Sequence, residues 1–226
     1  MLKRGLLPFF LLGILPLSAE SLPPDFAAVL QDFRADGPKG WSYTQTTVAG
    51  NESLVEHFNP AEPDFQRWTL VRKDGRAPTP DEIKTYNEGR SRRSSGATAP
   101  RLQDQLDLAS ATVVRNEGTR HLWHFHLQSG GLDDRAADSM GVTITFDQST
   151  RTIETVEIAS TAPFSPVFGV HIASTMTRMN YSRPTADRPS LLLSVTIQVR
   201  GRAFWFKSLD QDMTVTYTDQ TPALRK

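Results

Sequence analysis

The chain has 226 residues with 25 basic and 25 acidic side chains, so its formal net charge is zero. A chain of this length buries a large hydrophobic core as one domain, and its charge balance argues against nucleic-acid binding, which needs a basic excess or stripe. Cysteine is absent, which excludes disulfides, thiol nucleophiles, zinc–thiolate sites and iron–sulfur clusters.

The N-terminal segment has the pattern of a secretory signal. Lys3 and Arg4 precede an apolar run over residues 6–17, and small residues follow up to Ala19. This order of charge, apolar run and small residues is typical of a signal peptide, and the run is too short to span a membrane. We predict a signal peptide over residues 1–19 and a periplasmic mature chain without a transmembrane segment.

A helix is predicted near the start of the mature chain, from about residue 25 to 36. Asp25 suits the N-cap, and Gly37 followed by a proline ends the pattern. Four apolar residues recur at i, i+3, i+4 and i+7, as on one face of a helix: Phe26, Val29, Leu30 and Phe33. This stripe predicts a helix that packs onto a larger element.

From Trp41 onwards the hydrophobic period changes to two, which indicates β-strands. The first of these is "WSYTQTTV", with aromatic residues alternating with serine and threonine. The further predicted strands are Ser53–Phe58, Gln66–Lys73, Ala111–Asn116, Thr119–Gln128, Gly141–Asp147, Thr152–Ser160, Gly169–Tyr181, Leu191–Lys207 and Met213–Thr218.

About ten strands with few helices predict a mainly β fold of the α+β class. We expect a strongly curved antiparallel sheet, which either closes into a barrel or stays an unclosed β-barrel. The N-terminal helix and a short inserted helix would pack on its concave face. Residues 20–226 are predicted to form a single domain, with residues 88–101, rich in Arg, Ser and Gly, as a mobile loop.

The inserted helix follows from the stretch "RWTLVRKDGRAPTPDEIKTY". Thr79 suits an N-cap, Pro80 the first helical position and Glu82 the closing residue of a capping box. Basic residues before a helix N-terminus also suit an anion site. However, Thr79 and the acidic residues after it already supply oxygen acceptors at this terminus, so a joint between a strand and a helix is the preferred interpretation.

Other patterns give weaker functional indications. His124 and His126 share one strand face and could chelate a metal if a third ligand came from elsewhere, although surface histidines are the simpler interpretation. No G-x-S-x-G motif occurs, which argues against a serine nucleophile. We predict no catalytic residue, no metal and no cofactor. In "RAFWFK", residues 202–207, aromatic residues fall on both strand faces, which suits either a strand buried on both sides or one face lining an apolar cavity.

The order of elements resembles the periplasmic lipoprotein-localisation factors. The segments "VEHFNPAEPDFQRWTLVRKDGRAPTPDEIKTY" and "RGRAFWFKSLDQDMTVTYTD" also resemble uncharacterised bacterial secreted proteins associated with that superfamily. The resemblance implies an unclosed β-barrel whose apolar concave face is covered by helices and accepts acyl chains. The carriers' key surface positions cannot be matched here, so lipoprotein transport is not implied.

We therefore predict a non-enzymatic periplasmic protein that binds a lipid, acyl chain or other apolar ligand in a half-barrel. One alternative is a cell-envelope module that binds a protein partner, and a second is a metal-dependent hydrolase using the His-x-His pair. The residues expected to line the apolar concave face are Trp41, Trp68, Ile83, Tyr86, Phe125, Phe146, Phe204 and Trp205.

Overall fold

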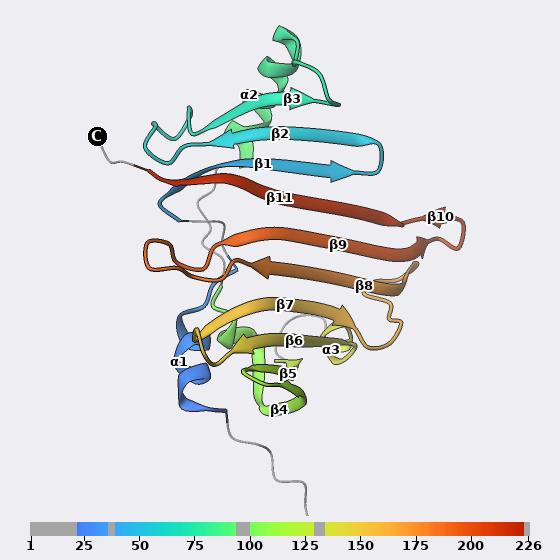
Figure 1. Ribbon diagram of the computed structural model, residues 1–226. Helices are drawn as coiled ribbons and strands as arrows, with labels where there is room; N and C mark the ends of the chain where they lie inside the picture. Colours follow the sequence, from blue (N-terminus) through green and yellow to red (C-terminus); the bar gives the residue numbers. More distant parts are fainter. Residues whose placement is uncertain (1–21, 36–38, 94–99, 129–133, 224–226) are drawn as a thin grey trace, which may run out of the picture.

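The computed structural model describes residues 22–35, 39–93, 100–128 and 134–223, and its strands form one antiparallel sheet (Figure 1). The predicted signal peptide lies outside these residues. The strands are β1 (Trp41–Ala49), β2 (Glu52–Phe58), β3 (Trp68–Lys73), β4 (Leu106–Glu117), β5 (Arg120–Leu127), β6 (Met140–Asp147), β7 (Thr152–Ser160), β8 (Val170–Tyr181), β9 (Leu192–Ala203), β10 (Lys207–Ser208) and β11 (Gln211–Pro222). The helices are α1 (Pro24–Asp32), α2 (Pro80–Arg93), the 3-10 helix η1 (Gln103–Gln105) and α3 (Asp134–Asp138).

The strand order is β3-β2-β1-β11-β9-β8-β7-β6-β5-β4, and the short β10 pairs with β9. Strands β3 and β4 are the two free edges of this order, so the sheet does not close. The prediction of a mainly β fold with an unclosed antiparallel sheet, an N-terminal helix and an inserted short helix is confirmed.

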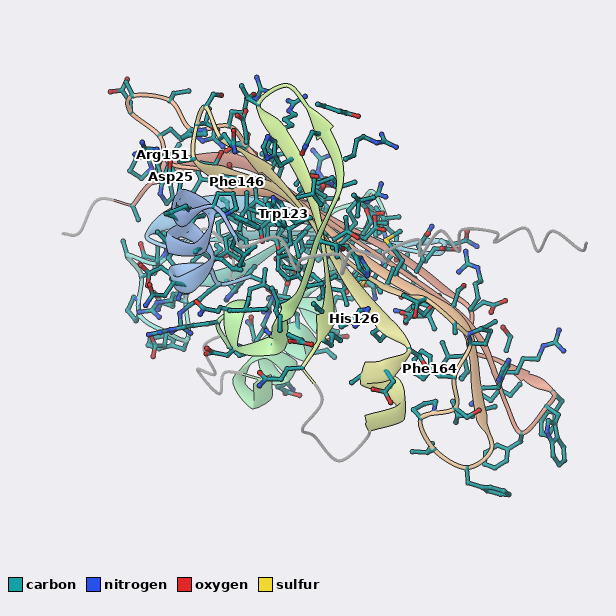
Figure 2. All side chains as sticks on the ribbon, turned by 90° about the horizontal axis from the view of Figure 1, so that it is seen from below. Asp25, Trp123, His126, Phe146, Arg151 and Phe164 are labelled. Carbon is teal, nitrogen blue, oxygen red and sulfur yellow. The ribbon has the colours of Figure 1, made fainter. Side chains whose placement is uncertain are left out.

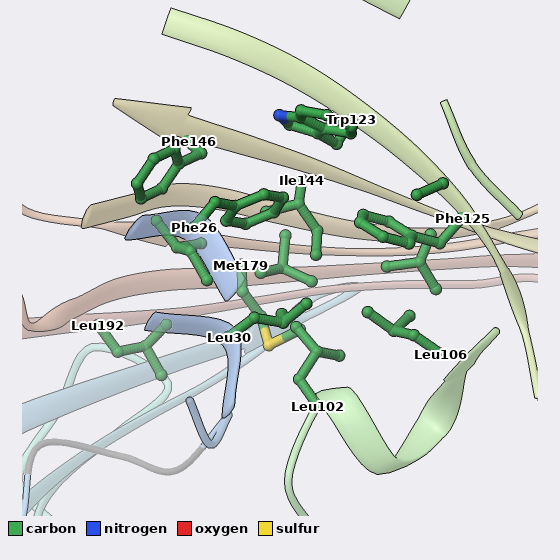
Figure 3. Close-up of a cluster of buried hydrophobic side chains, with 14 residues drawn as sticks. Phe26, Leu30, Leu102, Leu106, Trp123, Phe125, Ile144, Phe146, Met179 and Leu192 are labelled. Carbon is green, nitrogen blue, oxygen red and sulfur yellow. The ribbon is translucent and has the colours of Figure 1, made fainter. Parts of the chain in front are cut away.

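Helix α1 fills the inner face of the β5–β8 part of the sheet. The ring of Phe26 stacks on Phe146 with centroids 4.7 Å apart and lies 5.6 Å from Trp123. Phe26 and Leu30 are both buried, in a cluster that also contains residues of β5, β6, β7, β8 and β9 (Figure 3). The apolar stripe predicted for this helix therefore forms the centre of the core.

The boundaries of α1 differ from those predicted. The helix begins with Pro23 as N-cap, which forms no side-chain cap hydrogen bond, and it ends at Asp32. Asp25 instead lies in the first turn and pairs with Arg151 at 3.2 Å. The predicted stop at Gly37 lies outside the described residues.

Two other predicted elements need correction. Helix α2 continues to Arg93, so the first part of the predicted mobile loop 88–101 is helical, while residues 94–99 lie outside the described residues. Strand β9 ends at Ala203, so the segment predicted as a strand up to Lys207 contains a turn over residues 204–206. The short helix α3 was not predicted from the sequence.

Candidate ligand-binding site

Helix α2 starts with the predicted capping box. The Thr79 backbone N–H donates to the Glu82 carboxylate at 2.8 Å, and the Glu82 N–H donates to the Thr79 hydroxyl at 3.3 Å. The guanidinium of Arg76 donates to both Glu82 oxygens at 2.8 and 2.9 Å, and Lys73 lies 3.2 Å from the same carboxylate. The Arg76 hydrogen bond and the Thr79 N–H lower the pKa of Glu82. The two cations are thus engaged by a carboxylate, which favours the joint over an anion site.

The inner side of α2 is polar rather than apolar. Glu82, Tyr86 and Arg90 lie at i, i+4 and i+8, so they share the helix face that lines a cavity against the sheet. Ile83, the large aliphatic residue of the helix, remains 40% exposed. Helix α2 is therefore attached to the sheet through polar and aromatic side chains rather than through an apolar stripe.

Glu56 of β2 is the buried acid to which α2 is attached. Its side chain is flanked across the sheet by Gln45 and Leu70, and the residue is only 6% exposed. Its Oε1 accepts a hydrogen bond from the Tyr86 hydroxyl at 2.8 Å and from Arg90 Nη2 at 2.5 Å. Its Oε2 accepts a hydrogen bond from the Gln45 amide at 3.1 Å. Both carboxylate oxygens are therefore satisfied, as a buried charge requires.

An aromatic row lies next to Glu56 on the same sheet face. Tyr43, Phe58 and Trp68 stand opposite one another on β1, β2 and β3, with ring centroids 5.0 Å apart for the first pair and 4.8 Å for the second. The Arg90 guanidinium carbon lies 3.9 Å from the centroid of the Trp68 ring, a cation–π arrangement. Arg90 thus contacts both the acid and the aromatic row.

Burial keeps the phenols around this acid protonated. Burial raises the pKa of Tyr86, and the negative charge of Glu56 raises it further. The same two causes raise the pKa of Tyr217 on β11. Tyr86 therefore remains a hydrogen-bond donor to Glu56 throughout the neutral range.

A cavity of about 760 Å³ lies between α2 and strands β1–β3. This volume falls within the range of small-molecule sites, about 300–1,000 Å³. The walls combine apolar, neutral polar and charged side chains: Gln45, Thr47, Leu54, Glu56, Leu70, Lys73, Asp81, Glu82, Thr85, Tyr86, Gly89 and Arg90. The cavity suits a molecule with both an apolar part and a hydrogen-bonding part.

The residues predicted to line the concave face divide among five places. Tyr86 lines this cavity, and Trp68 borders it through Arg90. Ile83 and Trp68 line a second pocket of about 510 Å³, which also contacts α2 through Asn87. Trp41 lines a third pocket, of about 410 Å³, beside α1 and the start of β9.

The other four predicted residues do not border a cavity on the concave face. Phe125 and Phe146 are fully buried against Phe26, so they belong to the core (Figure 3). Phe204 and Trp205 belong to the exposed turn between β9 and β10, at the far end of the strands. The apolar concave face predicted as one ligand surface is thus filled by α1 over β5–β8.

The histidine pair lies on the outer face of the sheet. The rings of His124 and His126 are 5.8 Å apart, and His124 Nδ1 is 3.4 Å from the Thr143 hydroxyl. Within the described residues, no group of three or more His, Asp or Glu side chains is placed to hold a metal ion. The hydrolase alternative therefore lacks a third ligand in this part of the chain.

Two residues of the site, Glu56 and Arg90, were not predicted from the sequence. Glu56 alternates with Leu54 and Phe58 on one face of β2, so an acid in an otherwise apolar row was a detectable anomaly. Arg90 fell in a segment interpreted as a mobile loop, because the helix around it lacks an apolar stripe.

Comparisons with known proteins add no relative from which a function could be transferred. The chain matches no protein-family model, no curated protein and no solved structure. The resemblance to lipoprotein-localisation factors therefore stays a prediction. Among the described residues, no helix has the length and apolarity needed to cross a membrane.

Proposed function

We propose that this protein is a non-enzymatic binding protein that holds an amphiphile, such as a lipid or fatty acid, in the cavity between α2 and β1–β3. The observation that carries the proposal is the cavity of about 760 Å³ whose floor combines Leu54 and Leu70 with the hydrogen-bonded Glu56. Our sequence-based prediction of a periplasmic location is compatible with such a ligand, since lipids are exchanged between envelope membranes.

The apolar part of the ligand would lie along Leu54 and Leu70. Burying an acyl chain contributes roughly 0.8 kcal/mol per methylene. The polar part would meet the side chains of α2, where Thr85, Tyr86 and Arg90 offer hydrogen-bonding groups. Since Arg90 is already bound to Glu56, the ligand would share this cation rather than neutralise it alone.

Gly89 offers a direct way to test occupation of the cavity. It lines the cavity from α2, and a Cβ atom added there meets no other atom within 4 Å. Leucine has a higher helix propensity than glycine, so Gly89→Leu fills the space while favouring the helix. Gly89→Ala is the matched control, because it makes the same backbone change and adds little volume.

The experiment has two readouts on the protein as purified from cells. Native mass spectrometry with lipid extraction should find a bound amphiphile, and a fluorescent fatty-acid probe should bind. We expect Gly89→Leu to weaken probe binding at least about tenfold, equivalent to roughly 1.4 kcal/mol, and Gly89→Ala to bind as the parent does. Absence of both amphiphile and probe binding in the parent, or equal binding by Gly89→Leu, would rule the proposal out.

A further inference from the structure

The strongest unexplained surface lies at the opposite end of the strands from α1. Here the loop between β7 and β8, residues 161–169, meets the turn between β9 and β10, residues 204–206 (Figure 1). Exposed large hydrophobic side chains gather on these two segments, which together we call the aromatic tip. These side chains are Val167, Phe168, Phe204, Trp205 and Phe206. Phe168, Trp205 and Phe206 are 97%, 91% and 86% exposed.

The two segments of the aromatic tip form one ordered structure. The Phe204 N–H donates to the Gly169 carbonyl at 2.7 Å, and a Cβ atom on Gly169 would lie 2.9 Å from the Phe204 ring. Phe164 and Ile172 exchange two backbone hydrogen bonds at 3.0 and 2.8 Å, which fold the longer loop back onto β8 (Figure 2 labels Phe164). The exposed rings are therefore presented by a fixed scaffold.

The backbone of the turn is held in a form that aromatic residues rarely adopt. Phe204 and Trp205 have φ angles of 49° and 66°, in the left-handed region where glycine or asparagine is favoured. Trp205 gains no burial in return, because it is 91% exposed, and Phe204 stays 59% exposed although its ring lies against Gly169. Strain that is not compensated by packing at an exposed aromatic turn points to a role outside the fold.

The surroundings of the aromatic tip are basic. Residues 161–172 and 202–209 contain Arg202 and Lys207 and no Asp or Glu. Arg202 lies opposite His171 across β8 and β9, and both line a pocket of about 410 Å³ beside Trp205. Lys207 pairs with Ala203 on the other arm of the turn. The acids that follow the turn in the chain are engaged within the fold: Asp212 binds Arg200 at 2.7 Å, and Asp210 accepts from the Gly201 N–H at 3.1 Å.

We propose that the aromatic tip docks the protein onto a bilayer containing anionic phospholipids. Tryptophan and phenylalanine insert favourably at the level of lipid headgroups, and the flanking Arg202 and Lys207 would meet lipid phosphates. The tip is a protrusion rather than a groove, and it carries cations without acids, which suits a negatively charged flat surface. Docking is independent of the cavity under α2, although it would bring that cavity to a membrane.

The test is flotation with vesicles of phosphatidylethanolamine and phosphatidylglycerol, using the protein as purified from cells. We expect the parent to float, and Phe168→Ser/Trp205→Ser/Phe206→Ser to partition at least about tenfold less. The matched control is Phe65→Ser/Val114→Ser, which removes two other exposed hydrophobics, 79% and 60% exposed, outside the tip. This control should float as the parent does.

A charge variant separates the two contributions. Arg202→Gln/Lys207→Gln should lower binding to the anionic vesicles by about fivefold for each cation removed, and leave binding to pure phosphatidylcholine unchanged.

Equal flotation of the triple variant and the parent would overturn the proposal, as would a parent that binds no vesicles. Tip-dependent self-association in sedimentation, without vesicle binding, would assign the tip to a second copy of the chain instead. The tip variants should still bind the fatty-acid probe, so this proposal and the cavity proposal can fail separately.

Discussion

Glu56 on β2 and Arg90 on α2 are 34 residues apart in the chain, and the Arg90 Nη2 atom lies 2.5 Å from the Glu56 Oε1 atom. This ion pair joins the inserted helix to the sheet where an apolar stripe would usually do so. The carboxylate is almost fully buried, whereas the Arg90 side chain is 31% exposed. The stability of α2 therefore depends on a partly screened pair.

Breaking this pair from the cationic side should destabilise the fold. Arg90→Gln leaves the Glu56 carboxylate buried without a cation, and we expect the free energy of unfolding to fall by about 3 kcal/mol. This is the low end for buried pairs because water reaches Arg90. Urea unfolding measures the change.

A double-mutant cycle with Glu56→Gln then isolates the interaction. Glu56→Gln/Arg90→Gln should lose less stability than the sum of the two single variants, because no unpaired charge remains in it. Strictly additive losses would show that the two side chains do not interact in solution. Tyr86→Phe, which removes one hydrogen bond to Glu56, should cost only about 1 kcal/mol.

Phe26 should be the residue of α1 on which the core most depends. Phe26→Ala removes a fully buried ring that contacts Trp123, Phe125 and Phe146. We expect a loss of about 3–5 kcal/mol in the free energy of unfolding. Phe65→Ala, at a position 79% exposed, is the control and should change it by no more than about 0.5 kcal/mol. Similar effects of the two substitutions would contradict the position of α1.

Gly201 and Gly89 predict opposite responses to alanine. A Cβ atom on Gly201 would lie 2.6 Å from the His171 carbonyl oxygen, which is backbone and cannot rotate away. We expect Gly201→Ala to destabilise by about 1–3 kcal/mol. Gly89→Ala in α2 meets open space and should stabilise by up to about 1 kcal/mol through helix propensity. Thermal unfolding compares the two, and a destabilising Gly89→Ala would place α2 differently.

His124 should make stability depend on pH in the mildly acidic range. Burial lowers the pKa of His124 below its ordinary value of 6.5, and the neighbouring His126 lowers it further. The unfolded chain therefore binds this proton more readily than the folded one. The stabilisation is fully present above about pH 6.5 and is lost as the pH falls through the lower, folded-state pKa.

Unfolding free energies between pH 7.5 and 5 test this expectation. His124→Asn should make the decline toward low pH shallower. His126→Asn removes the neighbouring positive charge but leaves His124 partly buried, so a smaller change of slope is expected. An unaltered slope in His124→Asn would show that other groups cause the decline.

Regular periodicity made much of this fold predictable. The alternating pattern of β1 and β6 and the stripe of Phe26 and Leu30 follow from one buried and one wet face, which local sequence records directly. The capping box of Thr79 and Glu82 was predictable for the same reason, since its partners lie three residues apart.

The candidate site was less predictable because it depends on exceptions to those patterns. Arg90 belongs to a helix whose inner face is polar, so the hydrophobic period that identifies helices is missing there. The turn at Phe204 and Trp205 uses left-handed backbone without glycine or asparagine, so aromatic alternation was interpreted as a strand. Which predicted residues meet in space also depends on strand order, which one sequence does not reveal.

That strand order has a consequence for how the protein forms. Strand β1 pairs with β11, and β11 pairs with β9, so β11 is the strand that connects β1–β3 to the rest of the sheet. During synthesis, the segment carrying α2 must wait for the last strand to leave the ribosome before it can join the sheet. Such pairing between distant parts of a chain slows folding. Truncation within residues 211–222 would remove the strand pairing that links β1–β3 to β9.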